Sequence, residues 1–410
     1  MIASPANTKT ERRGDLDFIR ALLVLGLVFF HAARIFDLMP YYVKNEKTST
    51  LMMALVGFVS QWGMPMLFFM AGIATWHSLN RRTVGQFIRE RIRRLLVPFI
   101  FGVLVIAPPL RYYALLANPD YHDSFRQFYP QFLRVVLTPS FPRFFRADPE
   151  VGLFEIAHLW FLYYLFVFCL MALPLFVWLK KDSARRFISR VAVACNRRGM
   201  ILLLALPVVS IELFVNLGES AGWNRYSFLS FLIMGFIFAS DDRFEKSASR
   251  NSIIALAAGT FAVAVFFWAS VTTWQEGVDP SRGYALESVL WRSFKGLSSW
   301  FWVMAIWGLG QRYKPRRSSL EHADIETRSR PAIINKILRY ANEAVLPFYI
   351  IHETVVVIVG FYVVKWPSGV MVKYFAVSLA SVAATLLIYE VFARRTNITR
   401  FLFGMKLRKS

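Results

Sequence analysis

The chain has 410 residues, of which 56% are hydrophobic and 16% aromatic, and its formal net charge is +22. Apolar segments of about twenty residues recur along the whole length, which excludes an ordinary soluble domain. The basic residues lie in short stretches between these segments, where the positive-inside rule explains them without a nucleic acid partner. We therefore expect an all-α polytopic membrane protein embedded in the lipid bilayer and no nucleic acid.

About ten transmembrane helices are predicted from the apolar segments. They cover residues 16–39, 51–77, 95–117, 157–179, 200–217, 226–240, 253–273, 288–309, 337–364 and 371–393. Prolines within them predict kinked or broken helices, because proline removes a backbone donor. These are Pro98, Pro108, Pro109, Pro207 and Pro347.

The loops between the predicted spans alternate in charge. One set of loops and tails carries 32 Lys and Arg residues, and the opposite set carries 8. The positive-inside rule then places both termini in the cytoplasm, with tails at 1–15 and 394–410 and a cytoplasmic loop at 310–336. The largest extracytoplasmic loop is 118–156. We expect a multi-pass protein of the inner (cytoplasmic) membrane.

The first span carries two ionisable residues, Arg20 and His31, with ten residues between them. Eleven helical steps make about three turns and advance about 16 Å, so both side chains lie on one face. Ionisable groups at such depth usually face a protein interior and carry function. The alternative is a snorkelling arginine at a helix end and a hydrogen-bonded core histidine.

A basic run, RERIRRLLVPF, precedes and enters the third span. Its Arg91 and Arg94 share a helix face, and two guanidinium groups at one mouth suit a phosphate-bearing ligand. The alternative is ordinary anchoring to anionic lipid.

Two further segments combine histidines with aromatic or acidic residues. HLWFLYY places His158 and Trp160 at the outer end of the fourth span, where they could meet a sugar or form part of an aromatic belt. The loop at 118–156 is rich in aromatic residues and suits either sugar stacking or an interfacial helix. The ninth span contains Glu343, His352 and Glu353, three ionisable groups that are costly to expose to lipid.

A straight helix would point Glu343 and His352 to opposite faces, but Pro347 lies between them, so this geometry is left open. No HExxH, paired CxxC, P-loop or GxSxG motif occurs, and no metal is expected.

Five segments in this order resemble the acyltransferase family 3 of integral membrane proteins, and most closely its glucan succinyltransferase branch. They are LDFIRALLVLGLVFFH, MPMLFFMAGIA, RERIRRLLVP, HLWFL and EAVLPFYIIHETV. The resemblance covers essentially the whole chain, residues 1–410, as one acyltransferase-3-like membrane domain. It implies transfer of an acyl group, of the acetyl or succinyl class, from cytoplasmic acyl-CoA to a hydroxyl of an extracytoplasmic carbohydrate or glycan.

The resemblance also implies that His31 is the essential histidine and Arg20 its partner, and that Arg91 and Arg94 bind the donor. No cofactor is permanently bound, since acyl-CoA is a substrate. His31 would act either as a general base or as a covalent acyl carrier. Glu343 or Glu353 would orient an imidazole, and His352 would serve as a second polar group. A transporter or flippase of a polar molecule or glycan is the alternative function, and a homo-oligomer is left open.

Overall fold

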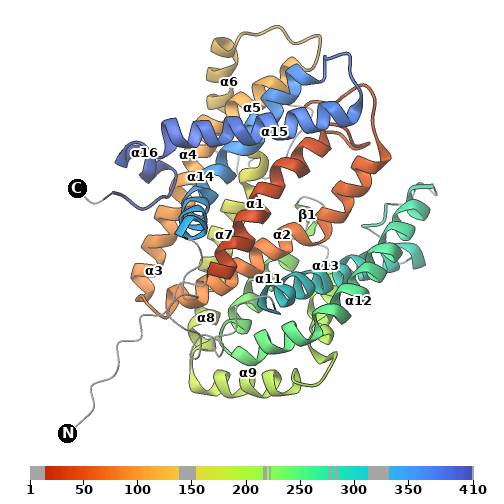
Figure 1. Cartoon of the computed structure of the whole chain (residues 1–410), viewed down its shortest axis with the longest axis vertical. Helices are drawn as coiled ribbons and strands as arrows, with labels where there is room; N and C mark the ends of the chain where they lie inside the picture. Colours follow the sequence, from red (N-terminus) through yellow and green to blue (C-terminus); the bar gives the residue numbers. More distant parts are fainter. Residues whose placement is uncertain are drawn as a thin grey trace.

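The computed structural model describes residues 14–137, 154–215, 219–220, 223–275, 277, 279–281, 285–312 and 332–408. The predicted tail at 1–15, the outer loop at 118–156 and the inner loop at 310–336 therefore lie partly outside the described residues. Within these ranges the regular secondary structure is helical apart from two short antiparallel strands, β1 (Glu219–Ser220) and β2 (Trp223–Asn224). Figure 1 shows long helices packed side by side.

The first half of the chain supplies the helices that carry His31, the basic run and His158. In chain order they are α1 (Gly14–Arg34), α2 (Thr50–Leu79), α3 (Val84–Arg91), η1 (Ile92–Leu96), α4 (Val97–Phe101), η2 (Gly102–Ile106), α5 (Ala107–Leu116), α6 (Phe125–Leu137), η4 (Ala157–Leu159), α7 (Trp160–Met171), α8 (Leu173–Leu179) and α9 (Asp182–Ala194).

The second half supplies the remaining helices, among which α14 carries His352 and Glu353. They are η5 (Met200–Ala205), α10 (Leu206–Phe214), α11 (Arg225–Phe238), α12 (Asp242–Gln275), α13 (Leu286–Arg312), α14 (Ala332–Val363), α15 (Val370–Ile388), η8 (Tyr389–Ala393) and α16 (Asn397–Leu402).

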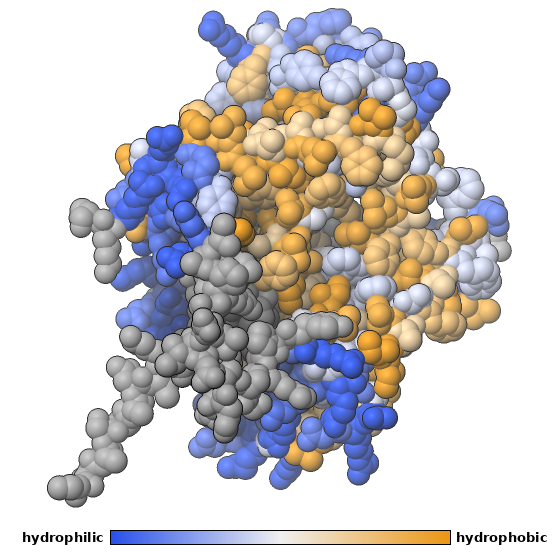
Figure 2. Space-filling view, viewed as in Figure 1, coloured by the Kyte–Doolittle hydropathy of each residue, from blue (hydrophilic) through white to orange (hydrophobic). Residues whose placement is uncertain are grey.

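Each of the ten predicted spans contains helix, and the described helices are those of a multi-pass membrane protein. Five helical segments are long and apolar enough to cross a membrane. A sixth is obtained if the pair Ala157–Met171 and Leu173–Leu179, bent by 53°, counts as one span. Figure 2 shows a broad apolar surface with hydrophilic residues gathered at its edges. The number ten and the cytoplasmic side of both termini stay predictions.

The prolines of the third span coincide with π-helical turns. Pro98 has no N–H to give to the carbonyl of Arg94, and the π-helical turn η1 precedes it. Pro108 likewise has no N–H to give to the carbonyl of Leu104, which lies in η2. That carbonyl accepts a hydrogen bond from the Tyr129 hydroxyl at 3.1 Å instead. The predicted irregularities therefore take the form of wide turns inside a continuous span.

Two glycines allow α2 and α11 to touch backbone to backbone. A Cβ on Gly72 would lie 2.1 Å from the carbonyl oxygen of Leu232, and one on Gly235 would lie 1.9 Å from that of Phe69. Only hydrogen fits at these positions, so the two helices approach more closely than side chains would permit. This contact joins the two halves of the chain in the core.

The segment after α1 folds back into the bundle. The helix ends at Arg34, five residues before the predicted end at residue 39. Asp37 is fully buried and pairs with Arg34 at 2.6 Å and with Lys44 at 2.9 Å. Lys373 on α15 donates to the side chain of Asn45 at 2.9 Å. These contacts fix residues 35–49 and direct Tyr41 toward α14.

The described part of the large predicted outer loop forms α6. Its rings of Phe128 and Phe132 are fully buried, and they contact the rings of Tyr112 and Phe154. These two aromatic residues therefore pack inside the protein and are not available for stacking on a sugar. The loop residues from 138 to 153 lie outside the described residues.

Candidate active site

The carboxylate of Glu353 is the centre of a polar cluster between α1, α7 and α14. Its Oε1 lies 2.9 Å from Nδ1 of His31 and accepts a hydrogen bond of 2.9 Å from the Tyr41 hydroxyl. Its Oε2 accepts the backbone N–H of His158 at 3.0 Å and lies 2.8 Å from that residue's Nδ1. Both oxygens of this buried group are therefore occupied by donors, as a buried carboxylate requires.

His31 is the histidine of the cluster with an accessible side chain. Its side chain is 14% exposed, compared with 4% for His158, and His352 is fully buried. An ionised carboxylate can only accept, so Glu353 selects the tautomer of His31 that carries its proton on Nδ1. Nε2 of His31 then has its lone pair available for chemistry.

His158 is held beside Glu353 by contacts of its ring and of its backbone. Nδ1 faces Glu353, and Nε2 lies 3.0 Å from the carbonyl oxygen of Ile350. Tyr349 donates its hydroxyl to the carbonyl oxygen of His158, which ties the start of α7 to α14.

His352 completes the group of three imidazoles. Its ring centroid lies 5.2 Å from that of His31 and 4.9 Å from that of His158. Nδ1 lies 2.6 Å from the carbonyl oxygen of Tyr349, whereas Nε2 is buried and has no hydrogen-bond partner among the described residues. A buried and unpartnered ring nitrogen of this kind can accept a hydrogen bond from a ligand.

Tyr41 is a member of the cluster that sequence reasoning missed. Its hydroxyl also lies 3.3 Å from Nδ1 of His31. Burial and the neighbouring carboxylate of Glu353 raise the pKa of Tyr41 well above its usual range, so the hydroxyl stays protonated and donates. The neighbouring Tyr42 donates instead to Glu155 at 2.8 Å. No periodic pattern marks Tyr41, because it lies in an irregular segment.

The structure brings together three of the residues singled out from the sequence, His31, His158 and His352, and adds Glu353, which was weighed beside Glu343. Glu343 lies elsewhere: it pairs with Arg400 at 2.7 Å, ten residues before Glu353 on α14. Arg20 lies three turns from His31 on α1, about 16 Å along the helix, and is partly buried.

Trp160 does not reach the cluster directly, although it is two residues from His158. Its ring stacks on Phe228 with a centroid distance of 5.4 Å and on Phe68 at 6.4 Å. Trp160 is partly exposed. His158 and Trp160, the two residues for which a sugar contact was predicted, therefore lie in different surroundings: His158 is buried in the cluster, and Trp160 packs against phenylalanine rings.

The two arginines predicted to bind the donor share one carboxylate. Nη2 of Arg91 lies 4.0 Å from Glu90, and Nε of Arg94 lies 3.5 Å from it. The side chain of Arg91 is only 12% exposed, and its guanidinium carbon lies 4.7 Å from the ring centroid of Phe87. Nε of Arg91 is buried without a hydrogen-bond partner in the described chain. This arginine therefore points into the protein and not toward surrounding lipid.

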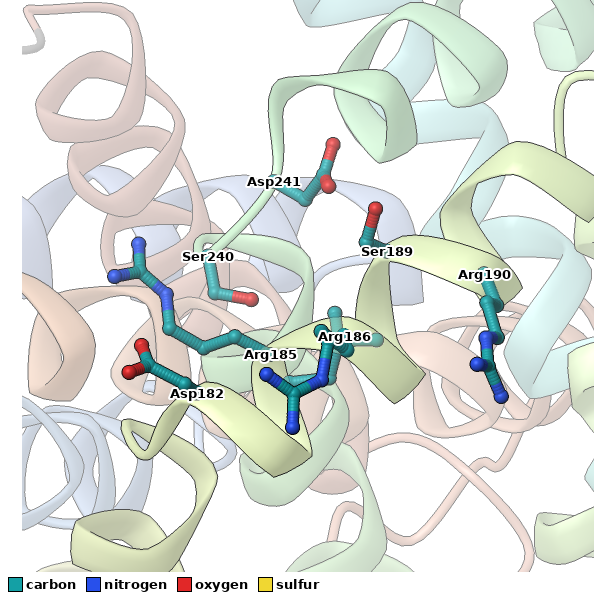
Figure 3. Close-up of a pocket in the computed structure, with 8 residues that line it drawn as sticks. Asp182, Arg185, Arg186, Ser189, Arg190, Ser240 and Asp241 are labelled. Carbon is teal, nitrogen blue, oxygen red and sulfur yellow. The ribbon is translucent and has the colours of Figure 1, made fainter.

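A basic pocket of about 620 Å³ lies apart from the histidines, along α9. Figure 3 shows that the side chains of Arg185, Arg186 and Arg190 point in different directions from this helix. Asp241, at the pocket wall, pairs with Arg243 at 2.6 Å, and the hydrogen bonds from Arg243 lower the pKa of that carboxyl. The arginines do not converge on one point, so this pocket resembles an ordinary charged surface more than an anion site.

Within the described ranges, no group of three or more His, Cys, Asp and Glu residues is arranged to hold a metal ion. His31 and His158 share the carboxylate of Glu353, whereas the hydrogen bond of His352 is to a backbone carbonyl. The arrangement suits acid–base or nucleophilic chemistry at His31.

Comparison with known proteins agrees with this chemistry. A family model described as an acyltransferase domain, that of acyltransferase family 3, matches residues 13–390, nearly the whole chain. No curated protein and no solved structure matches the chain. The histidine cluster and both arginines fall within the matched residues. The chain belongs to acyltransferase family 3 and is a membrane-embedded acyltransferase that transfers groups other than aminoacyl groups.

Proposed function

We propose that the protein transfers an acyl group, of the acetyl or succinyl class, from cytoplasmic acyl-CoA to a hydroxyl of an extracytoplasmic carbohydrate or glycan. The observation that carries the proposal is the pairing of His31 with Glu353 at 2.9 Å. It leaves one nitrogen of an accessible imidazole free to take a proton. We also propose the inner membrane as its location, with ten spans and both termini in the cytoplasm.

The first step is deprotonation of the acceptor. Nε2 of His31 takes the proton of the acceptor hydroxyl, and the resulting imidazolium is stabilised by Glu353. The acceptor oxygen forms a bond to the thioester carbonyl carbon, and the carbon–sulfur bond then breaks. The departing thiolate takes the proton from Nε2 of His31, so that coenzyme A leaves as a thiol and the base is regenerated.

A covalent route uses the same atoms in a different order. Nε2 of His31 would attack the thioester carbon, the carbon–sulfur bond would break and coenzyme A would leave as a thiolate. The acceptor oxygen would then bond to the acyl carbon as its bond to Nε2 breaks, and the hydroxyl proton would pass to the thiolate, so that coenzyme A leaves as a thiol. In both routes Glu353 holds the imidazole in one tautomer and offsets its positive charge. Nε2 of His352 would accept a hydrogen bond from a polar group of the substrate near His31.

The donor would bind through its phosphates to Arg91 and Arg94. Support comes from Arg91, whose side chain is only 12% exposed and whose buried Nε has no hydrogen-bond partner in the described chain. Phosphate is a stronger partner for a guanidinium than a shared carboxylate because it accepts two parallel hydrogen bonds. An incoming phosphate would displace Glu90 from the two arginines. The pantetheine arm would then extend along the bundle toward His31.

Release of free thiol from acyl-CoA by the purified protein tests the proposal. With acetyl-CoA or succinyl-CoA and an oligosaccharide acceptor, the wild type should release thiol and acylate the acceptor, while His31→Ala should do neither. A protein that moves a solute without chemistry would release no thiol. Acylation by a well-folded His31→Ala variant at the wild-type rate would contradict the assigned role of His31.

A further inference from the structure

The last helix and the residues after it contact both helical elements of the proposed donor and acyl-transfer sites. The C-terminal segment, defined here as residues 397–408, begins with α16 and lies beyond residue 390, where the match to the family model ends. It packs against α4, which follows the basic run, and Figure 1 shows α16 beside α4. Two sets of contacts fix its position.

The first set holds the basic run. The guanidinium carbon of Arg93 lies 5.8 Å from the ring centroid of Phe401. Gly404 has a φ of +65°, and a Cβ there would lie 2.8 Å from Pro98 and 3.0 Å from the carbonyl oxygen of Arg94. Pro98 is the residue that leaves this carbonyl without its usual helical donor. The segment thus packs on the π-helical turn that carries Arg94, at a position where only glycine fits.

The second set holds α14. Nη2 of Arg400 lies 2.7 Å from the carboxylate of Glu343, and its Nε donates to the carbonyl oxygen of Lys406 at 2.7 Å. The arginine of this ion pair is buried, with Arg400 6% exposed, whereas the side chain of Glu343 is 33% exposed. Glu343 begins the stretch of α14 that reaches Glu353 less than three turns later. One segment therefore touches the helix of the arginines and the helix of the histidines.

We propose that the C-terminal segment is a clamp that fixes η1 and α14 relative to each other, so that Arg400 and Glu343 are positioning residues for acyl-CoA binding. The inference rests on the proposed donor site at Arg91 and Arg94. Pro98 leaves the carbonyl of Arg94 in this π-helical turn without its usual helical donor, and a support from outside limits the movement of the turn. The pair Arg400–Glu343 supplies that support from the opposite side.

The test uses the purified full-length protein and free coenzyme A as the probe. Arg400→Ala should raise the dissociation constant of coenzyme A about tenfold, because the arginines are no longer held at a fixed spacing. Arg395→Ala is the matched control: it removes the same charge from the same stretch of chain. Arg395 is exposed, and its Nε donates only to the carbonyl oxygen of Glu390. The dissociation constant of coenzyme A for Arg395→Ala should equal that for the wild type.

Glu343→Gln provides a second variant that removes the charge but keeps an oxygen that can accept a hydrogen bond from Arg400, at a side chain that is 33% exposed. It should weaken coenzyme A binding as Arg400→Ala does, and the double variant should bind no worse than either single one, since both weaken the same contact. At saturating acyl-CoA, thiol release should keep its wild-type rate. A lost ion pair that only lowered stability would shift the melting temperature and leave binding unchanged.

Two results would overturn the inference, and they differ in what else they overturn. Wild-type binding by Arg400→Ala and Glu343→Gln, together with weakened binding by Arg91→Ala, would remove the clamp and keep the donor site. Equal binding by the wild type and Arg91→Ala, or no binding of coenzyme A at all, would remove the donor site and the clamp with it.

Discussion

Glu353 on α14 places its Oε1 2.9 Å from Nδ1 of His31 on α1, although the two residues come from opposite ends of the chain. The same oxygen accepts the hydroxyl of Tyr41, and the other oxygen faces His158. Each partner of Glu353 is a donor, so the carboxylate is held in one orientation. The imidazole of His31 is thereby held with Nδ1 at Glu353, which leaves Nε2 for the role of base in the proposed mechanism.

Glu353→Gln is expected to lower the rate of acyl transfer by about 10²–10⁴-fold, in the range of His31→Ala. An amide can present N–H groups to the two imidazoles, which disrupts the tautomer of His31 and removes the charge that stabilises its protonated form. Turnover measured at saturating acyl-CoA checks this. Glu46→Gln, at an exposed residue of the loop after α1, is the control and should retain wild-type turnover.

Tyr41→Phe is expected to slow turnover about tenfold to a hundredfold, because one hydrogen bond to a charged group is lost from Glu353. Tyr42→Phe is the matched variant, since it removes a hydroxyl that donates to Glu155 and not to Glu353. Turnover of the two variants under identical conditions decides the point. An equal loss in both would mean that the segment acts through its packing, without a specific role for the Tyr41 hydroxyl.

Removing either Arg91 or Arg94 is expected to weaken donor binding by about tenfold to a hundredfold, because charge-assisted contacts to phosphate contribute roughly 1.5–3 kcal/mol each. Lysine should restore only part of the loss, since it supplies charge without two parallel donors. Titration of acyl-CoA against the Ala and Lys variants measures both effects. Full replacement by lysine would identify the arginines as topological anchors.

The orientation predicted from loop charge has its own test. Reporter fusions after Asp148 should be active in the periplasm, and fusions after Lys409 should be active in the cytoplasm. The 32 to 8 distribution of basic residues between the two sets of loops is the reason for this expectation. A periplasmic reporter that is active at the carboxyl end would contradict the proposed arrangement.

Much of the helical organisation could be predicted from the sequence because long apolar runs have few alternatives in a bilayer. His31, His158 and His352 could be singled out for the same reason: each is an ionisable residue in an apolar stretch. The choice between Glu343 and Glu353 could not be made. Both lie on α14, and which of them faces α1 depends on how the helices rotate when they pack.

Tyr41 escaped prediction for a different reason. It lies in residues 35–49, where the backbone is irregular and no repeat of apolar residues indicates which side chain turns inward. Its direction is set by the contacts of Asp37 and of Asn45 with Lys373, which lies far along the chain. The first span was predicted to extend to residue 39, whereas its helix ends at Arg34. The apolar residues directly after Arg34 are buried in the bundle although they are not helical, and a sequence pattern cannot distinguish these two cases.

The separation of His31 and Glu353 along the chain has a consequence for synthesis. At rates of about 5–20 residues per second, a ribosome needs on the order of 15–60 s to proceed from α1 to α14. Throughout that interval His31 lacks the carboxylate that, in the proposed mechanism, fixes its tautomer and offsets its positive charge. On the proposed mechanism, a prematurely terminated chain would not consume acyl thioesters, and activity would begin only when the final helices join those already inserted.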